Sequence, residues 1–105
     1  MNEPDNLQGS AHLDIELSNE VAEGVYANLV MIAHSSEEFI LDFIRIMPGV
    51  PKARVKSRII ITPSHAKRLL HALAENIDKY EQAHGEIAEH GGLPAMRFGV
   101  PGGEA

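Results

Sequence analysis

Six histidines are the first residues to examine for chemistry, because imidazole nitrogens are common metal ligands. His65 and His71 are six residues apart, as are His84 and His90. Two ligands on one face of a helix must instead be three or four residues apart. The sequence also has no cysteine that could complete a zinc site. We therefore expect no metal and no cofactor. The full set is His12, His34, His65, His71, His84 and His90.

The dipeptide Ser64-His65 contains a hydroxyl and an imidazole, the groups of a nucleophile and its base. Adjacent positions do not by themselves form that hydrogen bond, and Ser64 is better explained as a residue at the start of a helix. No pair of carboxylates can be assigned to a common cleft. We therefore predict no catalytic residues, no small-molecule substrate and a protein that is not an enzyme.

Charge is strongly segregated along the chain. Seven basic residues and no acidic residue lie between Phe43 and Ala74, whereas the rest of the sequence has two basic and fifteen acidic residues. Such a segment can engage an anionic surface, either an acidic protein or nucleic acid. Four of these residues are expected to share one strand face, and two others to lie at the start of the helix. These candidate partner-binding residues are Lys52, Arg54, Lys56, Arg58, Lys67 and Arg68.

A simpler interpretation is that the basic row is a solvated strand face. Acidic residues of neighbouring strands, such as Asp14, Glu16 and Asp42, would then neutralise it. Nucleic-acid binding would also favour exposed aromatic side chains or a recognised motif. The chain has only three Phe and two Tyr, and their positions indicate core residues.

The basic segment includes a change of hydrophobic period. Residues 53–61 alternate as in a strand and end in three β-branched isoleucines. Thr62 is then the expected helix N-cap, with Pro63 at the first helical position. Apolar residues recur every three or four positions to Tyr80, and Gly85 is the expected stop. The pattern predicts a helix over 63–84.

Three further strands are expected before this one, over residues 13–18, 25–34 and 38–47. Residues 18–24 are expected to be a polar connection, in which residues 19–23 can form a helical turn that Gly24 ends. With short connections between the last three strands, the sequence predicts an α+β fold. It is a four-stranded antiparallel sheet followed by one long helix packed on one face.

The remaining segments complete the predicted organisation. Residues 1–11 are expected to be a disordered arm, residues 12–85 a single domain, and residues 86–105 a tail rich in glycine and proline. The N-terminus has no signal-peptide pattern, and no apolar run approaches the roughly 18 residues of a membrane helix. We therefore expect no membrane partner and a cytoplasmic location.

The middle two expected strands carry apolar residues on both faces. Because one helix covers only one face of a sheet, the other face must contact something else. The candidates are a second copy, the C-terminal tail or a client polypeptide. We favour self-association into a homo-oligomer.

The chain also resembles a known family. The similarity rests on residues 25–28, 38–43, 47–49, 58–70 and 76–81, and above all on Thr62-Pro63-Ser64-His65-Ala66-Lys67. These resemble the bacterial and archaeal domain of unknown function numbered three thousand four hundred and sixty-seven, over residues 13 to 105. Met47-Pro48-Gly49 and the tail segment 92–99 resemble its Bacteroidetes-type version.

The resemblance implies no activity, because the family has none to carry over. It implies a partner in transcription, since members of this version are encoded beside the large RNA polymerase subunits. The order of four strands and a helix is also similar to that of the export chaperone SecB. Two hypotheses follow: an interaction module that binds an acidic partner, and a SecB-like holdase that binds unfolded chains.

Overall fold

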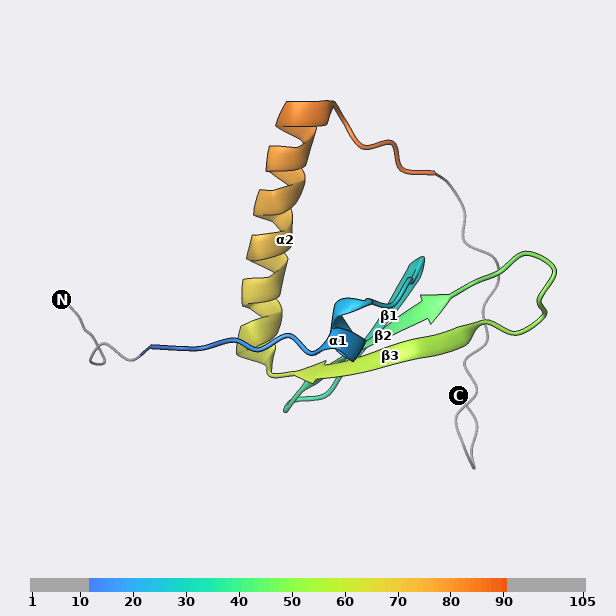
Figure 1. The fold of residues 1–105 in the computed structure, drawn as a ribbon, viewed down its shortest axis with the longest axis horizontal. Coiled ribbons are helices and arrows are strands. Elements are labelled where there is room, and N and C mark those ends of the chain that lie inside the picture. The colour runs from blue at the N-terminus through green and yellow to red at the C-terminus, as the bar shows by residue number, and fades with distance from the viewer. Residues whose placement is uncertain (1–11, 91–105) are drawn as a thin grey trace. The chain divides into compact units, whose positions relative to one another are not determined.

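The computed structural model describes residues 12–90. Its elements, in order, are α1 (Asn19–Ala22), β1 (Leu29–His34), β2 (Phe39–Arg45), β3 (Arg54–Ile61) and α2 (Pro63–His84) (Figure 1). The chain divides between Pro63 and Ser64 into two compact units, the first containing the sheet and the second containing α2 from Ser64 onward. The predicted α+β class, with an antiparallel sheet and a long C-terminal helix, is confirmed. The predicted arm, residues 1–11, and residues 91–105 of the predicted tail lie outside the described residues.

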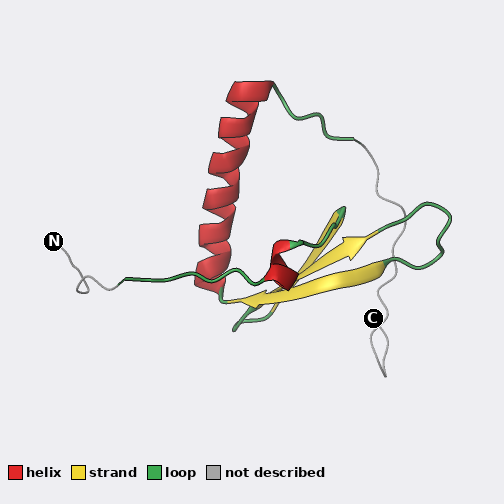
Figure 2. Cartoon of the chain, in the orientation of Figure 1, coloured by secondary structure: helices red, strands yellow, loops and turns green. Residues whose placement is uncertain are grey.

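The three strands form one antiparallel sheet in the order β1-β2-β3 (Figure 2). A short turn joins β1 to β2, in which the Ser35 N–H donates to the Glu38 carbonyl at 3.0 Å and the Glu37 N–H donates to Ser35 Oγ at 3.1 Å. The strands predicted at 25–34, 38–47 and 53–61 are therefore present, each somewhat shorter than expected.

The prediction of a fourth strand at 13–18 is wrong for this chain. Residues 12–18 are not part of the sheet, and Leu13, Ile15 and Leu17 are 84%, 86% and 67% exposed. Alternating side chains show that a segment suits an extended backbone with one apolar face. A ladder also requires a neighbouring strand, and the pattern does not encode one.

The register assigns each strand residue to one of two faces, because directly opposed residues point the same way. The phenylalanine face is built on Phe39, Leu41 and Phe43 of β2, and the aspartate face on Ile40, Asp42 and Ile44. The phenylalanine face also includes Val30, Ile32, His34, Arg45, Arg54, Ser57, Ile59 and Ile61; the aspartate face also includes Leu29, Met31, Ala33, Val55, Arg58 and Ile60.

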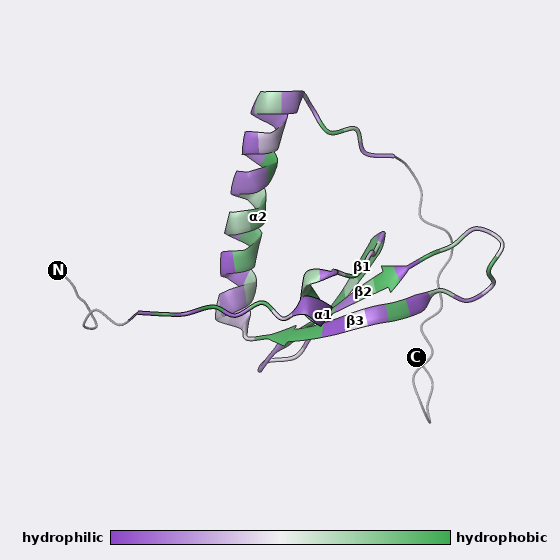
Figure 3. Ribbon diagram, viewed as in Figure 1, coloured by the Kyte–Doolittle hydropathy of each residue, from purple (hydrophilic) through white to green (hydrophobic). Residues whose placement is uncertain are grey.

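Burial within the described chain is concentrated on the central strand. Leu41 and Ile44 are the buried apolar residues, and Asp42 is the buried charged one. Apolar residues of the outer strands stay exposed on both faces, including Ile32 at 61% and Ile60 at 55%. Figure 3 shows how apolar and polar residues are distributed along the ribbon. The prediction that both faces are apolar is therefore confirmed, and both leave apolar surface open.

α2 has the predicted bounds, and the polar connection before β1 contains the short helix α1. Ser18 caps α1, its Oγ accepting from the Val21 N–H at 3.2 Å, and Gly24 follows with φ +79°. α2 spans Pro63–His84, and Gly85, with φ +92°, donates its N–H to the Glu81 carbonyl at 2.9 Å. No residue of α2 is buried, and its apolar stripe is largely exposed: Leu69, Leu70, Leu73, Ile77 and Tyr80.

Candidate functional site

A tight turn shapes the loop that carries the first predicted cation. The Val50 N–H donates to the Met47 carbonyl at 3.2 Å, closing a turn around Pro48 and Gly49. Proline fixes φ near −65° at the first central position, and Gly49 adopts φ +79° at the second. These are the requirements of a type II turn. Lys52 lies just beyond it, in the segment leading to β3.

The end of β2 is held by the side chain of Asn28. Its Nδ2 donates to the Ile46 carbonyl at 3.0 Å, and its Oδ1 accepts from the Ile46 N–H at 2.8 Å. The Asn28 N–H also donates to the Ile44 carbonyl at 2.9 Å. These three bonds continue the pairing beyond Leu29, the first residue of β1, and Arg45, the last residue of β2. Asn28 thereby fixes the backbone on both sides of Arg45.

A β-bulge at Lys56 overturns the predicted single row of cations. Phe43 opposes Ser57 and Ile44 opposes Val55, so Lys56 is an extra residue of β3. An extra residue reverses the alternation from that point onward. Arg54 therefore lies on the phenylalanine face, opposite Arg45, whereas Arg58 lies on the aspartate face, opposite Asp42. The expectation that Lys52, Arg54, Lys56 and Arg58 share one strand face is wrong, because alternation cannot reveal a bulge.

Arg58 is paired with the buried carboxylate of Asp42. Arg58 Nε donates to Oδ1 at 2.7 Å and Nη2 donates to Oδ2 at 2.8 Å, a two-bond geometry that suits a planar guanidinium. The Asp42 side chain is 7% exposed and that of Arg58 is 50% exposed. The hydrogen bonds from Arg58 lower the pKa of Asp42, against the opposing effect of burial. For Arg58, the interpretation of a neutralised strand cation is therefore correct.

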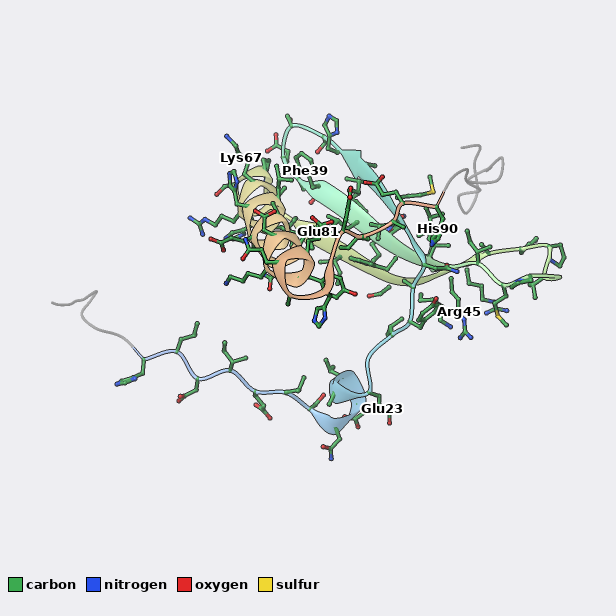
Figure 4. The ribbon with its side chains drawn as sticks, turned by 90° about the horizontal axis from the view of Figure 1, so that it is seen from above. Glu23, Phe39, Arg45, Lys67, Glu81 and His90 are labelled. Atoms are coloured by element: carbon green, nitrogen blue, oxygen red, sulfur yellow. The ribbon has the colours of Figure 1, made fainter. Side chains whose placement is uncertain are left out.

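Four other cations lie near the loop that joins β2 to β3, at the end of the sheet away from the β1–β2 turn. We call Arg45, Lys52, Arg54 and Lys56 the hairpin cations. All four are exposed, and none forms an ion pair within residues 12–90. The Arg45 guanidinium lies 5.8 Å from the centre of the Tyr26 ring, within range of a cation–π contact. Figure 4 shows Arg45 near the end of the sheet and Phe39 toward its other end.

Lys67 and Arg68 lie in the second unit, near the start of α2. Both are exposed, and the first turn of this helix has no acidic residue. The positive end of the helix dipole is therefore not offset by a carboxylate there. Of the six predicted residues, the structure thus places Lys52, Arg54 and Lys56 in the hairpin, pairs Arg58 with Asp42, and puts Lys67 and Arg68 on α2.

Arg45 is the member of this surface that sequence reasoning left out of the site. It belongs to the basic segment, but it is on β2, and only the strand register shows that it opposes Arg54. The Met-Pro-Gly sequence two residues later was the available signal, because a tight turn there brings the flanking positions together. The contribution of Asn28 had no signal in the sequence, since its partner lies 18 residues away.

The described chain offers exposed charge and apolar surface. Across residues 12–90, no three His, Cys, Asp or Glu side chains are grouped so that they could hold a metal ion. In the same span, no helix has the length and apolar character needed to cross a membrane. Exposed cations of this kind can attract a negatively charged surface.

Comparisons with known proteins place these features in a family. The chain matches neither a curated protein nor a solved structure. Residues 1–89 match the family described as "Protein of unknown function (DUF3467)". That match includes the sheet, the hairpin cations and α2, and it ends before the tail segment 92–99. Since it covers most of the sequence, the chain belongs to the DUF3467 family.

Proposed function

We propose that this protein is a non-enzymatic interaction module whose hairpin cations bind an acidic partner. The observation that carries the proposal is the direct opposition of Arg45 and Arg54 on one sheet face, with Lys52 and Lys56 nearby in sequence. None of the four has an acidic partner among residues 12–90. Like charges directly opposite each other destabilise a sheet, and an anion bound between them would relieve that repulsion.

Arg58 provides the contrast that makes this argument specific. Arg58 of β3 has a structural role, because its Nε lies 2.7 Å from Oδ1 of Asp42. At the other end of the same strand, no carboxylate of residues 12–90 forms an ion pair with Arg54. Within one hairpin, a paired arginine and unpaired arginines therefore coexist, and the unpaired ones are available to a partner.

An acidic protein surface fits the hairpin better than single-stranded nucleic acid does. Strand-binding surfaces usually combine cations with aromatic rings on which bases stack. Among residues 12–90, the aromatic ring within cation–π range of a hairpin cation is that of Tyr26, which already lies against Arg45. We therefore propose an acidic protein as the partner, in a cytoplasmic, transcription-linked setting such as RNA polymerase. Lys67 and Arg68 would extend the same charge attraction.

The apolar surfaces support the accompanying proposal of self-association. The described chain buries only Leu41 and Ile44 among its apolar residues, and the α2 stripe from Leu69 to Tyr80 is exposed. A core this small is marginal without further burial. We propose that α2 covers one face of the sheet in the assembled homo-oligomer and that a second copy covers further apolar surface.

A binding experiment with a defined polyanion tests the charge-driven proposal. We expect polyglutamate to bind the wild-type chain with an affinity that falls as salt rises, because exposed charges are screened over about 10 Å at 0.1 M salt. Replacing all four hairpin cations with Gln should abolish most of this binding. Lys79→Gln, on α2, is the matched control. Binding that survives the fourfold change and ignores salt would exclude this surface. Duplex DNA binding more tightly than polyglutamate would reverse the choice of partner.

A SecB-like holdase is the second candidate, and the open phenylalanine face favours it. Val30, Ile32 and Ile59 on this face are 42%, 61% and 45% exposed. An extended apolar client would cover them. In that case Ile32→Ser should stop the protein from suppressing aggregation of an unfolded client, and the fourfold Gln variant should still suppress it. The opposite pattern would reject the holdase.

A further inference from the structure

Residues 12–18 have the sequence of a strand without a neighbour. Leu13, Ile15 and Leu17 alternate with Asp14 and Glu16, and each of the three apolar side chains is at least two-thirds exposed. No hydrogen bond within the described chain involves residues 12–17, and Ser18 begins the cap of α1. An exposed apolar stripe on an extended segment is unfavourable in water unless another surface covers it.

The two edges of the sheet are protected to different degrees. β3 carries a bulge at Lys56 and the cations Arg54 and Arg58, devices that discourage another strand from pairing. β1 has none of them. Its register with β2 is regular over all six residues, and the sequence between Glu23 and Glu37 contains no Asp, Glu, Lys or Arg. The outer edge of β1 is therefore the open pairing edge of this sheet.

We propose that residues 12–18 of one copy pair with the outer edge of β1 of a second copy, and that two copies exchange these segments reciprocally. This inference specifies the self-association proposed above and does not depend on the hairpin cations. The seven-residue segment matches the six residues of β1 in length. Within residues 12–90, neither this segment nor the outer edge of β1 is paired with another strand, as expected for two halves of an exchange.

Side-chain chemistry sets the orientation of the donated strand. With Leu13, Ile15 and Leu17 on the phenylalanine face, they would adjoin Val30 and Ile32, the exposed large apolar residues of β1. Asp14 and Glu16 would then point to the aspartate face, where β1 contributes Leu29, Met31 and Ala33. No acidic residue of β1 would oppose them. The exchange would cover apolar surface on both the donor and the acceptor.

The oligomeric state tests the donor segment. We expect the wild-type chain to have twice its 11.5 kDa mass in light scattering, and the triple variant Leu13→Ser, Ile15→Ser, Leu17→Ser to have the single-chain mass. The matched control, Asp14→Asn with Glu16→Gln, changes the other side of the same segment and should remain a dimer. Since residues 12–17 make no hydrogen bond within the described chain, the triple variant should keep β1, β2, β3 and α2, and its circular dichroism spectrum should lose only the small strand signal of the donated segments. A monomeric wild-type chain at high micromolar concentration would overturn the proposal.

A spin label then identifies the acceptor and shows whether pairing occurs between chains. The sequence has no cysteine, so Glu16→Cys provides a single labelling site. Spin-labelled, isotopically unlabelled chains are mixed with ¹⁵N-labelled wild-type chains, and the amide signals of Leu29–His34 should broaden. Broadening of β3 instead would overturn the assignment of the edge. Broadening of β1 only when label and ¹⁵N are in the same chain would overturn the exchange. If exchange fails while polyglutamate binding persists, the charge-driven function stands alone.

Discussion

Arg45 and Arg54 directly oppose each other across the β2–β3 pair, so two guanidinium groups share one face of the sheet. Three residues away along β2 and four residues away along β3, beyond the bulge and on the other face, the same two strands pair Asp42 with Arg58. The hairpin thus contains a stabilising charge pair and a repulsive one. The repulsive pair is the feature that folding alone does not account for.

Removing one member of the repulsive pair should slightly stabilise the protein. We expect Arg54→Gln to raise the free energy of unfolding by roughly 0.2–1 kcal/mol at low salt. High salt should shrink the gain, because screening weakens the repulsion in the wild type. Urea denaturation at two salt concentrations measures this. A clear loss of stability at both would show that Arg54 makes a favourable contact in the folded protein.

Removing the cap at the end of β2 should loosen the hairpin. Asn28→Ala deletes two hydrogen bonds to the Ile46 backbone, and we expect a loss of about 1–2 kcal/mol. Amide exchange at Ile46 should accelerate more than exchange at Leu41, which lies inside β2. Asn76→Ala is a suitable control, because within residues 12–90 its side-chain amide donates to the Ala72 carbonyl, inside α2. Equal acceleration across the sheet would contradict a local role for Asn28.

Acid should weaken the fold through Asp42. The pKa of Asp42 in the folded protein is lowered below its ordinary value of 3.8 by the hydrogen bonds from Arg58. The ionised carboxylate therefore stabilises the folded state at pH values above 3.8, and this contribution is lost as the pH falls through the lower, folded-state pKa. Asp42→Asn should be less stable at neutral pH by roughly 1 kcal/mol and should have a flatter acid limb.

Urea denaturation between pH 2.5 and pH 6 measures both effects. Glu75→Gln, which removes an exposed carboxylate from α2, should leave the acid limb as it is in the wild type. An unchanged acid limb in Asp42→Asn would show that another carboxylate dominates.

A side chain at the second central position of the loop turn should lower the stability of the protein. Gly49 has φ +79°, and a Cβ there would meet no atom within 4 Å, so the strain is confined to the backbone. We expect Gly49→Ala to destabilise the protein by about 1 kcal/mol. Gly49→Asn should cost less, because Asn adopts this conformation more readily. Thermal unfolding would rank the two, and equal melting temperatures would argue against strain.

Periodicity predicted the elements whose signal lies within one segment. Pro63 and Gly85 set the bounds of α2, and alternation located β1, β2 and β3. Relationships between segments were not accessible in this way. The bulge at Lys56 depends on how β3 opposes β2, and the missing strand at 13–18 depends on whether a neighbour exists. The pairing of Arg58 was anticipated as an alternative, since Asp42 was already a candidate counter-ion.

The Asp42–Arg58 pair also bears on how the chain reaches its fold. A β2–β3 hairpin with its register shifted by one residue would place Arg58 opposite Leu41 or Phe43. Arg58 would then lie on the phenylalanine face, whereas Asp42 lies on the aspartate face. The Asp42 carboxylate would then be buried among apolar side chains without the Arg58 guanidinium, at a large desolvation penalty. Misaligned hairpins should therefore be short-lived. Because the ion pair forms only in the native register, it would select the correctly aligned β2–β3 hairpin during folding.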